Sequence, residues 1–94
     1  MNISLDYDNT YTTDPVMWDA IVNMMKRHGH KVYVVTMRTP EEGYEVTQYL
    51  GDKVEDIIFT SRKGKMDFVQ AKNISIDIWI DDMPWFILND ARQL

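Results

Sequence analysis

The sequence predicts an α/β fold: a single Rossmann-like domain of three layers, in which a four-stranded parallel sheet lies between helices. Two observations indicate it. Four short segments, mostly rich in β-branched or aromatic residues, alternate with four helical segments. The connections are short, and alternating strands and helices of this kind build parallel sheets with right-handed crossovers. The 94 residues leave no room for a second unit, so we expect one domain over residues 1–94.

The first strand–helix unit begins with an apolar strand at residues 2–7. Asp14-Pro15 predicts the start of the first helix, because an Asp side chain accepts free amide hydrogens and Pro is favoured in the first turn. Apolar residues recur at helical spacing behind this start. Gly29 predicts the end of the helix, after a last turn of basic residues.

The second unit begins with residues 31–36 (KVYVVT), whose β-branched and aromatic side chains predict a strand. Thr39 and Glu42 have the spacing of a capping box, with Pro at the first helical position. We therefore expect one helix over residues 40–50, which Gly51 breaks.

Two further strands complete the predicted sheet. Residues 56–60 (DIIFT) predict the third strand, and a short helix over residues 65–72 follows it. Residues 74–80 alternate strictly between isoleucine and other residues, which predicts a fourth strand over that whole segment. Beyond it, we expect a final helix from about Pro84 to the C-terminus.

The composition excludes several classes of protein. The net charge is −5 and the pI is about 4.8, whereas a stable binder of nucleic-acid backbones needs a basic face. The chain has no cysteine, which excludes disulfides and thiolate metal sites. It has no apolar run near the roughly 20 residues of a membrane span and no signal-peptide pattern. We therefore expect a cytoplasmic protein with no membrane partner.

Polar side chains gather where the predicted strands end. In parallel sheets of α/β proteins, ligands bind beyond the carboxyl ends of the strands. The residues at or just after those ends are acids, hydroxyls and cations: Asp6, Asp8, Thr36, Arg38, Thr60, Lys63, Lys65, Asp81 and Asp82. We therefore expect a single polar site at this edge of the sheet.

The four acids of this edge favour a metal site for a phosphate ester. Clustered carboxylates repel one another unless a cation lies among them, and oxygen ligands without His or Cys suit Mg²⁺. The metal would leave positions for a phosphate oxygen, and Lys65 and Thr36 could bind the other phosphate oxygens. One carboxylate could then attack phosphorus while another transfers a proton.

The motifs at these strand ends resemble those of the haloacid dehalogenase-like (HAD) superfamily of phosphohydrolases. DYDNT at residues 6–10 is similar to the first motif of that family, DxDx[TV], and VVT ending at Thr36 is similar to the second. Lys65, ahead of an amphipathic helix, is similar to the third motif, and IWIDD at residues 78–82 to the fourth. The four motifs occur in order and span almost the whole chain.

The resemblance implies a role for each matching residue. Asp6 would be the nucleophile that forms an aspartyl-phosphate, and Asp8 would be the general acid and base and would offer its backbone carbonyl to Mg²⁺. Thr36 and Lys65 would bind the phosphate. Asp81 and Asp82 would complete the metal site with Asp6, one of them directly. The family's strand order, 4-1-2-3, would bring these motifs together.

Three features depart from the family pattern. Asn9 stands where Gly is common, although Asn tolerates a left-handed turn. Lys63 competes with Lys65 for the third motif, and we favour Lys65 because it begins a helical pattern. Neither place where family members insert a cap domain has room for one, so the resemblance implies a capless protein. Arg38 lies on the same edge, either as a phosphate ligand or as a solvated loop cation.

The residues leave other functions open. A receiver-type signalling domain would need a fifth strand and a phosphoryl-accepting Asp after the third strand, where this chain has Thr60. A non-catalytic binding or regulatory module on the same scaffold is a second alternative, and a phosphatase of nucleotides or nucleic-acid ends is a third. The substrate would be a phosphorylated small molecule or an exposed phosphate on a larger molecule. The sequence does not indicate an oligomeric state.

Overall fold

Four parallel strands form one sheet in the computed structural model, which describes residues 1–92. The strands are β1 (Asn2–Leu5), β2 (Lys31–Thr36), β3 (Asp56–Phe59) and β4 (Ile78–Ile80). Their order is β3-β2-β1-β4, which is 4-1-2-3 when counted from the opposite edge of the sheet. β1 therefore lies between β2 and β4, and the carboxyl ends of these three strands meet at one edge.

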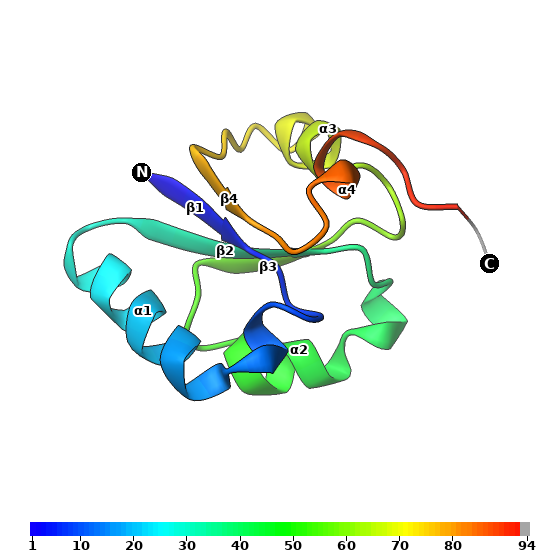
Figure 1. Cartoon of the computed structure of the whole chain (residues 1–94). Coiled ribbons are helices and arrows are strands. Elements are labelled where there is room, and N and C mark those ends of the chain that lie inside the picture. The colour runs from blue at the N-terminus through cyan, green and yellow to red at the C-terminus, as the bar shows by residue number, and fades with distance from the viewer. Residues whose placement is uncertain (93–94) are drawn as a thin grey trace.

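Helices cover both faces of the sheet (Figure 1). α1 (Pro15–Arg27) and α2 (Tyr44–Leu50) lie on one face, and α3 (Lys65–Ala71) and α4 (Trp85–Leu88) lie on the other. Two short 3₁₀ turns, η1 (Tyr11–Thr13) and η2 (Pro40–Glu42), precede α1 and α2. Within residues 1–92, no helix combines the length and the apolar character needed to cross a membrane.

The core follows from the alternation of side chains along β2. Val32 and Val34 are buried in a cluster with residues of α1 and α2, whereas Tyr33 and Val35 are buried in a second cluster with Val69 of α3. Successive side chains of a strand point to opposite faces, so a strand covered on both faces must be apolar throughout. This requirement explains the unbroken KVYVVT pattern of the sequence.

The helix starts follow the capping signals. The Asp14 carboxylate accepts a hydrogen bond from the Met17 amide (3.1 Å), as expected for an N-cap residue. Thr39 and Glu42 form both hydrogen bonds of a capping box.

The prediction of one continuous helix over residues 40–50 is wrong, because the capping box opens η2, and α2 is a separate helix. Gly43 separates η2 from α2 and lies directly against the ring of Phe59. A Cβ atom at Gly43 would lie 2.1 Å from that ring, so glycine is required there.

The fourth strand is shorter than the sequence predicts. Only Ile78–Ile80 forms β4, paired with β1 from Ile3 to Leu5. Because β1 begins at Asn2, residues 74–76 have no neighbouring strand. Asn2 instead binds this segment irregularly, accepting a hydrogen bond from the Asp77 amide through its backbone carbonyl and donating one from its side chain to the Ser75 carbonyl.

The predicted final helix is also too long. α4 ends at Leu88, and Asn89 is extended. The chain then runs against the loop between β3 and α3, where Asp90 accepts a hydrogen bond from the Gly64 amide (2.6 Å) and the Ala91 amide donates one to the Arg62 carbonyl (2.8 Å). These tertiary contacts replace the helix that local propensity favours.

Candidate active site

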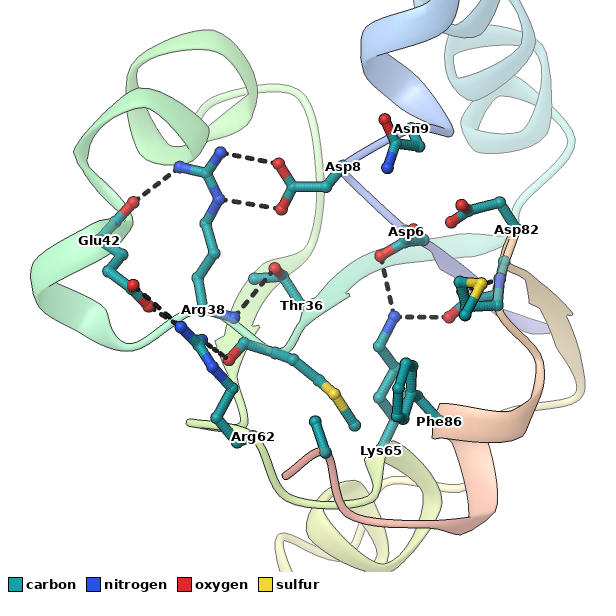
Figure 2. A pocket seen from close by; sticks show the side chains of 14 residues that line it. Asp6, Asp8, Asn9, Thr36, Arg38, Glu42, Arg62, Lys65, Asp82 and Phe86 are labelled. Carbon is teal, nitrogen blue, oxygen red and sulfur yellow. Dashed lines mark hydrogen bonds and ion pairs between the residues drawn. The ribbon is translucent and has the colours of Figure 1, made fainter. Parts of the chain in front are cut away.

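A cavity of about 470 Å³ lies at the carboxyl ends of β1, β2 and β4. It is lined by every residue that the sequence analysis assigned to catalysis, phosphate binding or metal binding, namely Asp6, Asp8, Thr36, Arg38, Lys65, Asp81 and Asp82. Figure 2 shows most of these side chains converging on it from separate segments. The structure thus brings these seven residues together at one edge of the sheet, whereas Thr60 and Lys63, which were also expected at this edge, do not line the cavity.

A buried lysine joins two acids at the centre of the site. The Nζ atom of Lys65 lies 2.8 Å from Asp6 Oδ1 and 2.5 Å from Asp81 Oδ2 (Figure 2). Lys65 is only 3% exposed, so these two carboxylates offset the cost of burying its charge. Asp6 follows β1, Asp81 follows β4, and Lys65 is the first residue of α3, so the fold itself brings the three together.

The Thr10 hydroxyl connects this group to Asp82. Its Oγ1 lies 3.1 Å from Asp6 Oδ2 and 3.2 Å from Asp82 Oδ1, so the single hydroxyl hydrogen can serve only one of them at a time. The backbone of Asp6 is fixed as well, because its amide donates to the Ile80 carbonyl (2.9 Å). Asp6 therefore has a defined orientation at the base of the cavity.

The electrostatics of Asp6 are unusual for an aspartate. Its pKa is raised from 3.8 to about 6, chiefly because burial disfavours the charged form; Lys65 opposes this shift, and the neighbouring acids Asp82 and Asp81 add to it. Asp6 is therefore still ionised at neutral pH, but its carboxylate is more basic than that of an exposed aspartate. A higher basicity makes a carboxylate a better nucleophile.

Three of the acids fit a hard divalent cation. Asp6, Asp81 and Asp82 each offer a carboxylate oxygen, and these oxygens lie within 4.8 Å of one another. Mg²⁺ prefers ligand sets made of oxygen atoms alone. Carboxylates also outnumber cations by two around the cavity, so a divalent cation would balance the charge. The donor set thus fits the metal that the sequence predicts.

Asp8 is held apart from this group by Arg38. The guanidinium of Arg38 makes two hydrogen bonds to the Asp8 carboxylate, Nε–Oδ2 at 2.9 Å and Nη2–Oδ1 at 2.7 Å (Figure 2). Arg38 also stacks over the ring of Tyr7, 5.1 Å from its centroid, and donates to the Glu42 carbonyl. Arg38 is therefore not a solvated loop cation, and its pKa is raised, chiefly by the hydrogen bonds to Asp8.

The structure also distinguishes the two candidate lysines and explains Asn9. Lys63 points outward, with 67% of its side chain exposed and its Nζ 3.8 Å from Asp90, and it does not line the cavity. Lys65 is therefore the lysine of the site. Asn9 has a φ of 60°, the left-handed conformation that its place after Asp8 was expected to require.

The sequence did not predict that two charged residues, Glu42 and Arg62, line the cavity. Arg62 makes a two-pronged ion pair with Glu42, with both N–O distances at 3.0 Å, and donates to the Met37 carbonyl. Arg62 and its neighbour Ser61 are both left-handed, with φ values of 73° and 53°. The sequence holds no glycine at these two positions to signal that turn, so the direction of the Arg62 side chain was not predictable.

Comparisons of the chain with protein-family models, with curated proteins and with solved structures give no match. The resemblance to the HAD superfamily therefore stays a prediction. A function has to be inferred from the contacts, charges and shape of the cavity itself.

Proposed function

We propose that this chain is a Mg²⁺-dependent phosphomonoester hydrolase that forms a covalent aspartyl-phosphate on Asp6, as expected for a capless protein of the HAD type. The observation that carries the proposal is the buried contact of Lys65 with Asp6 and Asp81 at the base of an open cavity. A purely structural ion pair needs neither a cavity nor the two further acids, Asp8 and Asp82, that line it.

Asp6 is the nucleophile in this proposal. One of its carboxylate oxygens attacks phosphorus, so an O–P bond forms on Asp6 while the bond from phosphorus to the leaving oxygen breaks. Lys65 and Thr10 hold the two carboxylate oxygens, which limits rotation of the side chain. Holding a nucleophile in one orientation before the reaction lowers the entropic part of the barrier.

Lys65 and Thr36 would bind the phosphoryl oxygens. Thr36 is buried at the end of β2 and lines the cavity with Lys65. Because carboxylates outnumber cations around the cavity, a phosphate dianion needs further positive charge. When bound, Mg²⁺ would be held by Asp6, Asp81 and Asp82 and would supply that charge and polarise a phosphoryl oxygen.

Asp8 would transfer the protons. It would give a proton to the leaving oxygen in the first step and take one from the water that hydrolyses the aspartyl-phosphate in the second. The fork of Arg38 uses two of the roughly four acceptor positions of a carboxylate, so the others stay open to the cavity. Arg38 thus orients Asp8 in addition to any contact it makes with phosphate.

The proposal is tested by phosphate release from a generic aryl phosphate and a panel of phosphomonoesters, each with Mg²⁺ and with EDTA. We expect turnover by the wild type with Mg²⁺ only, and a loss of at least about a thousandfold in kcat for Asp6→Asn. Asp67→Asn is the matched control, because Asp67 is exposed on α3 and does not line the cavity. It should keep wild-type activity.

Equal turnover by Asp6→Asn and the wild type would contradict the covalent mechanism. If no ester is hydrolysed although Mg²⁺ binds, the non-catalytic module becomes the better interpretation. The net charge of −5 makes a stable complex with nucleic acid unfavourable. The substrate we propose is therefore a phosphorylated small molecule or an exposed phosphate on a larger partner.

A further inference from the structure

Apolar side chains form the remainder of the cavity wall. Met37 follows β2, Met83 and Phe86 belong to the segment that carries α4, and Ala91 comes from the segment beyond it. Figure 2 shows the ring of Phe86 beside the Lys65 side chain. None of these four residues is needed to hold a phosphate, yet they adjoin the group that would hold it.

The cations of the cavity are already paired. The fork of Arg38 is used by Asp8 and the fork of Arg62 by Glu42, and Lys65, which contacts Asp6 and Asp81, is assigned to the transferred phosphoryl group. Among the described residues that line the cavity, no cation is left for a second phosphate or a carboxylate of the substrate. Recognition of the leaving group therefore falls to the apolar side chains.

Resting on the proposed function, we propose that the cavity selects phosphomonoesters whose leaving group carries a flat, apolar ring. Phe86 and Met83 are its specificity residues. An aromatic ring packs well against a phenylalanine ring and a methionine sulfur, and Met83, 49% exposed, can adjust its side chain to the ligand. A cavity of about 470 Å³ is large enough for a phosphate together with one ring.

The test compares 2-phenylethyl phosphate with ethyl phosphate, two esters of primary alcohols with similar intrinsic reactivity. We expect the wild type with Mg²⁺ to prefer the phenylethyl ester by about tenfold or more in kcat/KM. Phe86→Ala should lower this preference to roughly threefold or less, through a larger loss for the phenylethyl ester. Phe86→Leu, which keeps more of the packing, should give an intermediate preference and serves if the alanine variant does not fold.

Trp85→Ala is the matched control. Trp85 is the neighbouring aromatic residue of α4, but it is 67% exposed and does not line the cavity, so its removal should leave the preference unchanged. Equal kcat/KM values for the two esters, or a preference that survives both substitutions of Phe86, would overturn the inference while the hydrolase proposal stands. Failure to hydrolyse either ester would instead count against the hydrolase itself.

Discussion

Lys65 shows how a single residue can connect stability with function. A buried ammonium group is costly to desolvate, and here two carboxylates offset that cost at 2.8 and 2.5 Å. The same two contacts orient Asp6 for attack. The residue should therefore be required for folding as well as for activity.

We expect Lys65→Met to lower the free energy of unfolding by about 3–5 kcal/mol, because it leaves two buried carboxylates without their partner. Urea unfolding in EDTA measures this change. Lys63→Met is the matched control: its side chain is exposed and pairs only loosely with Asp90, so its effect should stay within about 0.5 kcal/mol. Equal losses in the two variants would contradict the assignment of Lys65 to the buried network.

At this scale, the residues that the sequence predicted share one property: each lies at or just after a strand end, or begins a helix. Asp6, Thr36, Lys65 and Asp81 are placed by the backbone of a parallel sheet, so their convergence follows from the order of the elements. Phe86 could not be assigned to the cavity in this way. Its direction depends on how α4 packs against α3, which no local pattern encodes.

At the scale of the elements, one ion pair connects η2 to the loop before α3. Glu42 closes the capping box of η2 and also accepts both hydrogen bonds from Arg62, which stands in the left-handed loop after β3. This ion pair joins two segments that line the cavity. It thus couples the start of α2 to the start of α3.

This pair predicts a stability change in acid. The pKa of Glu42 is lowered from 4.5 to about 2, mainly by the hydrogen bonds from Arg62 and then by the Thr39 amide. A lowered pKa stabilises the fold above pH 4.5, and this contribution is lost as the pH falls towards 2. Wild type should therefore be more stable than Glu42→Gln near neutral pH, and the difference should vanish in strong acid.

Urea unfolding of both proteins at several pH values between neutrality and strong acid measures that difference. Glutamine keeps the capping box, so the comparison isolates the charge. Glu41→Gln is the control, because Glu41 is exposed and makes no ion pair within residues 1–92; its difference from wild type should not depend on pH in this way. A constant difference between wild type and Glu42→Gln would contradict the prediction.

The bounds of an element were predictable where a local sequence signal sets them, and not where contacts with another part of the chain set them. The capping signals at Asp14 and Thr39 mark the starts of α1 and η2. The alternation over residues 74–80 predicted too long a strand, because pairing needs a partner and β1 begins only at Asn2. The helix expected to the C-terminus ends at Leu88, because the chain beyond it binds the loop before α3 instead.

In the whole molecule, the cavity is assembled from segments near both ends of the chain. Asp6, Arg38 and Asp81 follow three different strands of one sheet, and Lys65 begins α3. The unfolded chain cannot present these groups together. A cation that binds the folded cluster must therefore shift the folding equilibrium.

We expect Mg²⁺ to raise the melting temperature. At a concentration roughly ten times its Kd, binding adds about 1.4 kcal/mol, which corresponds to a rise of about 5–10 °C for a domain of this size. Thermal unfolding with MgCl₂, compared with NaCl of the same ionic strength, measures the rise. Asp82→Asn should reduce it clearly and Asp67→Asn should not; equal rises in all three proteins would argue against a cation at this cluster.

The position of Ala91 in the cavity wall has a practical consequence for attaching this protein to anything else. Met1 directly precedes β1, and its amino group contacts His30. Both residues lie at the amino ends of the strands, at the edge of the sheet opposite the cavity. A tag, surface or fusion partner joined ahead of Met1 would leave the cavity open. A partner attached close to Ala91 would instead lie next to the cavity wall and compete with bulky substrates for the approach to it.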